Sequence, residues 1–132
     1  MIAVLDASAA VRVALDPQSK FVAPLKDADL VVAPDLLVPE VCSAFRKYVR
    51  TRVLSQSNAD EMIGRALALV DEFQSTRELV PEVQALVSRS DSSVYDLFYV
   101  ALAKRTGGTL LTADVALRQI ALKTGVDAPA FE

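Results

Sequence analysis

The chain has 132 residues, of which 52% are hydrophobic and 23% are charged, and its formal net charge is −3. This composition fits one globular domain with a hydrophobic core, and it gives no overall basic field of the kind that favours nucleic-acid binding. The sequence contains no histidine, which excludes histidine-based triads, proton shuttles and zinc sites. Any bound metal would have oxygen ligands, which favours Mg²⁺ or Mn²⁺.

The predicted strands and helices alternate along the chain. Apolar runs predict buried strands at 2–5, 30–33 and 109–112, with a weaker strand at 78–80 and another near Val126. Helical patterns lie at 7–14, 21–28, 36–53, 57–73, 81–88, 94–105 and 115–123. The helix at 94–105 is apolar nearly all round, so we expect it to be deeply buried. We predict a single α/β domain over 1–132, with a mostly parallel sheet of four to five strands and helices on both faces.

Several features point to the cytoplasm. The chain shows no apolar run near the roughly 20 residues of a membrane span, and no secretory signal pattern. Cys42 is the only cysteine and has no disulfide partner within the chain, which suits a reducing compartment. We expect Cys42 to be a small buried apolar residue.

Four acidic residues stand out by their sequence context. Asp6 and Asp114 directly follow predicted strands, where open α/β sheets bind ligands. Asp96 lies in the first turn of the apolar helix, and Glu40 lies among apolar neighbours on the long helix. Carboxylates in apolar surroundings are costly unless they are paired or bound to a cation. A divalent cation would relieve the repulsion among four of them, so we expect a metal site.

Each acidic residue also has a structural explanation, which we favour when each is taken alone. Asp6 and Asp114 could be helix N-caps, and Asp96 could be favoured by the helix dipole. Glu40 could keep its carboxylate in solvent while its stem covers the core. Together, however, the four exceed what capping requires.

The four acidic residues lie in short motifs: VLDASA at 4–9, PDLLVPEV at 34–41, VYDLFYVALA at 94–103 and LLTAD at 110–114. In this order and spacing the chain resembles the PIN domain, and within it the VapC-type toxins of toxin–antitoxin pairs, over nearly its whole length. The resemblance implies a PIN-like three-layer sandwich and an RNA-cleaving Mg²⁺ or Mn²⁺ site at Asp6, Glu40, Asp96 and Asp114. Ser8 and Thr112 would be supporting hydroxyls. It also implies a homodimer and a small antitoxin that blocks the site.

Basic residues could hold RNA phosphates beyond this site. Candidates are Arg12 and, on the long predicted helix, Arg46, Lys47, Arg50 and Arg52. The alternative is a solvated helix face, which we favour slightly, because four basic residues within seven positions cannot all face one way. We expect Tyr95, Phe98 and Tyr99 to lie in the core or a dimer interface, and not to stack on bases.

The leading hypothesis is metal-assisted hydrolysis of RNA phosphodiesters by the toxin of a toxin–antitoxin pair. A PIN nuclease that processes RNA or DNA without a toxin role is the main alternative. A non-enzymatic, Mg²⁺-binding phospho-acceptor module would need paired acidic residues on the first strand and a lysine after a late strand, which this sequence lacks. A degenerate PIN fold that only binds a partner is disfavoured, because all four acidic positions are filled.

Overall fold

Strand β1 (Ile2–Leu5) lies inside a four-stranded parallel sheet in the computed structural model, which describes residues 1–131. The strand order is β3-β2-β1-β4, with β2 at Leu30–Pro34, β3 at Glu72–Gln74 and β4 at Thr109–Leu111. Val4 pairs with Val32 on one side and with Leu110 on the other. Ala3, Val4 and Leu5 are fully buried, which explains why this strand is apolar on both faces.

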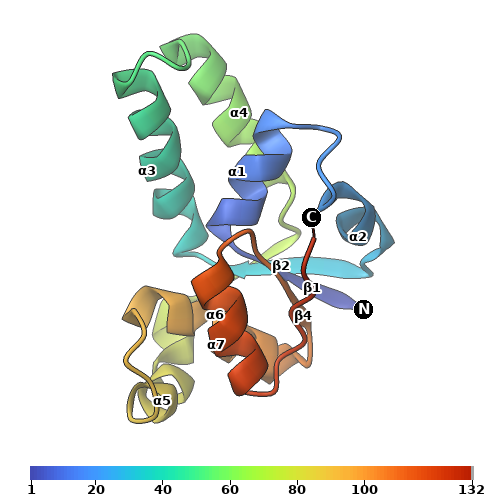
Figure 1. The fold of residues 1–132 in the computed structure, drawn as a ribbon, viewed down its shortest axis with the longest axis vertical. Coiled ribbons are helices and arrows are strands. Elements are labelled where there is room, and N and C mark those ends of the chain that lie inside the picture. Colours follow the sequence, from blue (N-terminus) through green and yellow to red (C-terminus); the bar gives the residue numbers. More distant parts are fainter. Residues whose placement is uncertain (132) are drawn as a thin grey trace.

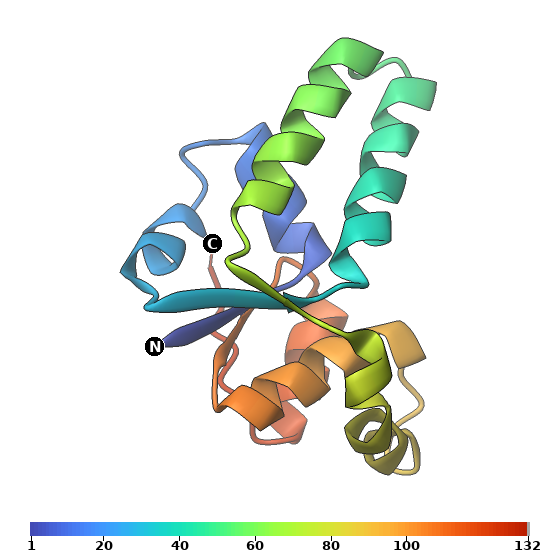
Figure 2. The same ribbon diagram turned by 180° about the vertical axis from the view of Figure 1, so that it is seen from behind.

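Seven helices cover the two faces of this sheet. They are α1 (Ala7–Leu15), α2 (Val22–Asp27), α3 (Leu37–Arg50), α4 (Gln56–Ala68), α5 (Thr76–Val87), α6 (Val94–Thr106) and α7 (Val115–Lys123). Figure 1 shows α1 to α4 on one side of the sheet and α5 to α7 on the other. In Figure 2, α3 and α4 form an antiparallel pair that projects away from the sheet. The predicted three-layer α/β architecture is therefore confirmed, and residue 132 lies outside the described chain.

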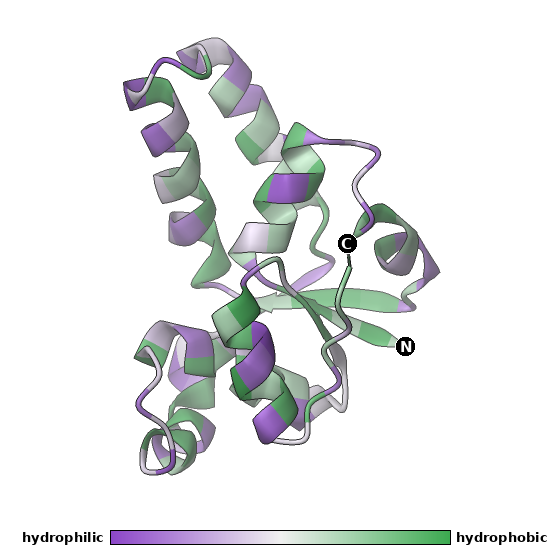
Figure 3. Ribbon diagram, in the orientation of Figure 1, coloured by the Kyte–Doolittle hydropathy of each residue, from purple (hydrophilic) through white to green (hydrophobic). Residues whose placement is uncertain are grey.

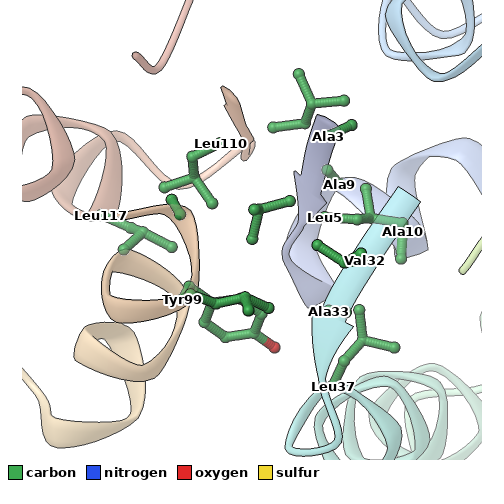
Figure 4. Packing of buried hydrophobic residues seen from close by; sticks show 14 of the residues in the cluster. Ala3, Leu5, Ala9, Ala10, Val32, Ala33, Leu37, Tyr99, Leu110 and Leu117 are labelled. Atoms are coloured by element: carbon green, nitrogen blue, oxygen red, sulfur yellow. The ribbon is translucent and has the colours of Figure 1, made fainter. Parts of the chain in front are cut away.

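The core fills the space between the sheet and its two helical layers. Figure 3 shows apolar residues concentrated on the strands and on the inward faces of the helices. Figure 4 shows Leu5, Val32 and Leu37 near the sheet, with Tyr99 entering from α6. As predicted, α6 is deeply buried, although Tyr95 near its start is 62% exposed.

The predicted third strand is wrong. Residues 78–80 lie inside α5, because Leu79, Val83 and Leu86 recur at helical spacing and face the core. Pro81 also lies inside this helix and not at its first turn. The actual third strand, β3, is a short edge strand with two exposed residues and one half-buried one, so it lacks the apolar pattern of a central strand.

Other local predictions also need correction. Cys42 is exposed and not buried, because it lies on the outer face of α3. The strand expected near Val126 is reduced to a single bridge between Thr109 and Asp127. In the part of the chain that the structure describes, no helix is long and apolar enough to cross a membrane.

Candidate active site

Asp6 lies at the carboxyl end of β1, and both of its carboxylate oxygens accept hydrogen bonds. Oδ1 accepts from the Ser8 hydroxyl at 2.6 Å and from the Ala9 amide at 3.0 Å, which makes Asp6 the N-cap of α1. Oδ2 accepts from the Thr112 hydroxyl at 2.9 Å. Asp6 is only 5% exposed, so these donors replace the water that a surface carboxylate would have.

The two hydroxyls that hold Asp6 also join the ends of β1 and β4. Thr112 Oγ1 accepts from the Asp114 amide at 3.0 Å, and Ser8 Oγ accepts from the Ala113 amide at 3.0 Å. The position of Asp6 is therefore coupled to the turn that carries Asp114. These are the two hydroxyls that the resemblance named as supporting residues.

Asp114 begins α7 in the way that Asp6 begins α1. Its Oδ1 accepts from the Ala116 amide at 2.9 Å and from the Leu117 amide at 3.2 Å. The capping explanation is thus correct for both residues. It does not exclude a second role, because in residues 1–131 Oδ2 of Asp114 accepts no hydrogen bond.

Glu40 and Asp96 approach the same end of the sheet from the first turns of α3 and α6. The hydroxyl of Tyr99, which is 2% exposed, donates to Oε1 of Glu40 at 2.5 Å. Glu40 is therefore held in a half-buried position instead of extending into solvent. The sequence predicts that Tyr99 lies in the core or a dimer interface, and it gives no signal of this contact, because nothing local links two residues 59 positions apart.

The carboxylates influence one another electrostatically. Burial raises the pKa of Asp6 from 3.8 to about 6, and the charge of Asp114 adds to the rise. Burial also raises the pKa of Asp96, again with a contribution from Asp114, and it raises the pKa of Glu40, with a contribution from Asp96. In residues 1–131, none of the three ion pairs neutralises any of these groups. The four predicted acidic residues therefore form one connected acidic region that favours binding of a cation.

The donor set suits a hard divalent ion that keeps part of its water shell. Within the described chain, no three acidic or cysteine side chains gather tightly enough to surround an ion by themselves. Mg²⁺ does not require such a cage, because it retains several waters and binds proteins through one or two carboxylates. The oxygen-only donors and the absence of histidine fit this mode of binding.

Four of the five predicted basic residues line two hollows on the α3 side of the site. Arg12 lines a hollow between α1 and α3 that also includes Ser8 and Glu40. Farther along α3, a second hollow is lined by Ser43, Arg46, Lys47, Arg50 and Thr51. Three of the four basic residues thus share one face, and only Arg52 lies past the helix end, with a φ of 61°.

Comparison with known proteins assigns the family. The model of the PIN domain family matches residues 3–123. This chain belongs to the PIN-domain family. This PIN domain is also 34% identical over 91 residues to Ribonuclease VapC3 from Pyrobaculum aerophilum, and the alignment covers 67% of each chain. The resemblance to VapC-type proteins is therefore confirmed.

Solved structures with this PIN fold agree with the observed topology. The crystal structure of PAE2754 from Pyrobaculum aerophilum is similar with a TM-score of 0.76 at 20% identity, covering 97% of this chain and 83% of that one. VapBC2 from Rickettsia felis, bound to a promoter DNA fragment, has a TM-score of 0.68 at 12% identity, and the match covers the whole of both chains. FitAcB from Neisseria gonorrhoeae has a TM-score of 0.64 at 18% identity, and the match covers 98% of this chain and 97% of that one. At these identities the likeness concerns the fold alone.

Proposed function

We propose that this PIN domain is a metal-dependent endoribonuclease that acts as the toxin of a toxin–antitoxin pair. The observation that carries the proposal is the acidic region formed by Asp6, Asp114, Asp96 and Glu40 at the carboxyl end of the sheet. Family membership and a relative named as a ribonuclease support the same reaction class. The proposed cofactor is Mg²⁺ or Mn²⁺, because all the candidate ligands are oxygens.

The chemistry is hydrolysis of a phosphodiester by water. Asp6, Asp96, Asp114 and Glu40 would hold the ion together, one or two of them as direct ligands and the others through its bound waters. When bound, the ion supplies an activated water and neutralises negative charge at the scissile phosphate. Ser8 and Thr112 fix the orientation of the Asp6 carboxylate, and the buried setting keeps competing solvent away from it.

The protein's own basic residues would bind the rest of the RNA. Arg46 and Arg50 share a hollow with Lys47, and no carboxylate lines that hollow. Their side chains are thus available to phosphates of a strand that runs along α3 away from the acidic region. Arg12 would contact a phosphate closer to the carboxylates.

The toxin role predicts protein partners as well as an RNA substrate. Two structural neighbours are VapBC2, which is bound to a DNA fragment from its promoter, and FitAcB. We propose a small cognate antitoxin that covers the acidic region, and a cytoplasmic location in which RNA is accessible. We also propose a homodimer, as the resemblance to VapC-type toxins implies, and the exposed Val80 and Val87 on α5 would lie in its interface.

The decisive experiment is brief expression followed by mapping of newly cleaved ends in cellular RNA. The wild-type chain should arrest growth and generate ends at defined RNA positions, whereas Asp6→Asn should do neither. Asp27→Asn, which removes an exposed carboxylate on α2, is the matched control and should behave as wild type. Equal toxicity of Asp6→Asn would refute the metal-site proposal. RNA cleavage without growth arrest would favour a nuclease that processes RNA without a toxin role.

A further inference from the structure

We propose that the hollow between α1 and α3 is a nucleotide subsite. In this subsite, the base of the RNA residue beside the scissile phosphate lies against Tyr48, and a phosphate of the same residue contacts Arg12. The inference rests on the proposed nuclease function and extends it, because it assigns a binding role to Tyr48 and states which part of the substrate binds there.

The hollow is continuous with the acidic region. It measures about 430 Å³, within the range of small-molecule sites, and both Ser8 and Glu40 line it. Ser8 donates its hydroxyl hydrogen to Asp6, and Glu40 accepts from Tyr99. A nucleotide in this hollow would therefore have its phosphate beside the carboxylates proposed to hold the metal.

The shape of the hollow follows from the spacing on α3. Glu40, Ala44 and Tyr48 occupy successive turns on one helix face, and all three line the hollow. The small Ala44 side chain leaves a space between the carboxylate at one end and the aromatic ring at the other. On the α1 side, Val11 and Leu15 provide an apolar wall.

Tyr48 is suited to stack on a base because its ring is already fixed. The ring packs against the fully buried Phe45, with ring centroids 5.9 Å apart and planes tilted by 55°. An aromatic ring that is held by the core loses little conformational entropy when it binds a ligand. Stacking of an unpaired base on such a ring is the usual way in which proteins hold single-stranded RNA.

Arg12 provides the charge that a phosphate requires. Its side chain is exposed in the last turn of α1, and it is the only basic residue in 1–131 that lines this hollow. It takes part in none of the three ion pairs formed by the described residues. A guanidinium presents paired donors that match the geometry of a phosphate. Together with Tyr48 and the apolar wall, it makes the hollow complementary to one nucleotide.

The test uses nucleoside 5′-monophosphates, which contain no phosphodiester and so bind without any hydrolysis. In Mg²⁺ buffer, titration of the isotope-labelled wild-type protein should shift amide NMR signals in α1 and around 44–48, with contacts between base protons and the Tyr48 ring. Tyr48→Ala should weaken binding about fivefold or more, which is the lower end of what base stacking contributes. Tyr48→Phe keeps the ring and should bind nearly as wild type, so it separates loss of stacking from loss of folding.

Two further probes assign the contacts separately. A nucleoside without phosphate should depend on Tyr48 but not on Arg12, whereas inorganic phosphate should depend on Arg12 but not on Tyr48. Lys20→Ala and Phe73→Ala, which remove an exposed cation and an exposed aromatic ring elsewhere, are the matched controls and should leave binding unchanged.

Three outcomes would overturn the subsite. They are absence of nucleotide binding, equal binding by Tyr48→Ala, and shifts in the hollow that only a co-expressed partner protein produces. None of these outcomes affects the proposed nuclease function, which the cleavage of RNA tests independently. Conversely, nucleotide binding in the hollow without RNA cleavage would refute the nuclease function and leave a nucleotide-binding site.

Discussion

The hydroxyl of Tyr99 in α6 donates a hydrogen bond to Oε1 of Glu40 in α3, across 2.5 Å. This contact connects the helical layers on the two faces of the sheet at the acidic region. It also occupies one oxygen of Glu40, which leaves the other oxygen for an ion or for a water. Tyr99 is therefore a positioning residue for Glu40.

Replacing Tyr99 with Phe tests this relationship. Tyr99→Phe should reduce the free energy of unfolding by about 2 kcal/mol, because a hydrogen bond to a half-buried carboxylate is lost. The hydrogen bond lowers the pKa of Glu40, so its loss should raise that pKa further and move the acidic limb of the pH–activity profile to higher pH. Urea unfolding and pH–rate profiles measure the two effects. Phe98→Leu is the control, because it changes the neighbouring aromatic residue without removing a hydroxyl. An unchanged pH profile for Tyr99→Phe would contradict the positioning role.

The stability of the metal-free protein should depend on pH through Asp6. The folded chain binds a proton at the Asp6 carboxylate more tightly than the unfolded chain does, since the pKa of Asp6 is about 6 in the folded chain instead of 3.8. The stabilising contribution is therefore complete below pH 3.8 and is lost as the pH rises through about 6. A shift of this size corresponds to at most about 3 kcal/mol.

Asp6→Asn isolates this contribution, because the amide does not ionise. In EDTA, the variant should be more stable than wild type at pH 7.5, and this advantage should disappear near pH 4. Part of this gain in stability is offset, because the amide group cannot accept the hydrogen bond from the Thr112 hydroxyl as the carboxylate does. Chemical unfolding at several pH values measures the difference, and parallel curves for the two proteins would contradict the raised pKa.

Metal addition should reverse the order of stability. A ligand that binds only the folded chain stabilises it by about 2.7 kcal/mol at a free concentration one hundred times its dissociation constant. Mg²⁺ should therefore raise the midpoint of thermal unfolding for the wild type, and it should do so less for Asp6→Asn. Potassium chloride at matched ionic strength is the control. EDTA should abolish RNA cleavage, and cleavage that survives chelation would contradict the mechanism.

Thr112 should be required for its hydroxyl and not for its shape. Thr112→Val leaves the Asp6 carboxylate and the Asp114 amide without their shared partner, which should cost about 1–3 kcal/mol in stability. It should also reduce activity, because Asp6 is no longer held from the β4 side. Thr112→Ser retains the hydroxyl and should keep most of the activity. If the valine variant retained full activity, the hydroxyl would have no positioning role.

Two glycines give a matched test of the fold. Gly107 ends α6 with a φ of 65°, so Gly107→Ala should destabilise the protein by about 1 kcal/mol. Gly64 lies inside α4 with open space around an added Cβ, so Gly64→Ala should stabilise it by up to about 1 kcal/mol. Thermal unfolding measures both changes, and effects of the same sign would contradict the assigned backbone roles.

Much of the fold could be predicted from the sequence, because its central strands are apolar and short. The runs that form β1 and β2 are buried on both faces, and they are readily distinguished from the amphipathic helices around them. The sequence does not indicate the edge strand β3, since a three-residue exposed strand has no apolar signature. Residues 78–80 resemble a strand because their helical spacing becomes visible only beyond Pro81, where Val83 and Leu86 follow Leu79 at helical intervals.

The candidate site was predictable only in part. Asp6 and Asp114 stand at strand ends, and parallel strands bring such ends to one edge of the sheet. The resemblance names Thr112 as a supporting hydroxyl, and Thr112 does donate to Asp6. The hydrogen bond from Tyr99 to Glu40 could not be predicted, because it joins two residues far apart in the sequence. The sequence gives no signal of a binding role for Tyr48, which packs partly against the core and also lines the hollow beside Glu40.

The contact between Asp6 and Thr112 joins positions 106 apart in the chain, so it also governs when the site can form during synthesis. A nascent chain carries Asp6 outside the ribosome long before Thr112 has been translated. Until β4 is released and pairs with β1, the first carboxylate has neither its second hydroxyl donor nor its neighbour Asp114. The acidic region therefore cannot assemble until the segment that carries Thr112 and Asp114 has been translated and has joined the sheet.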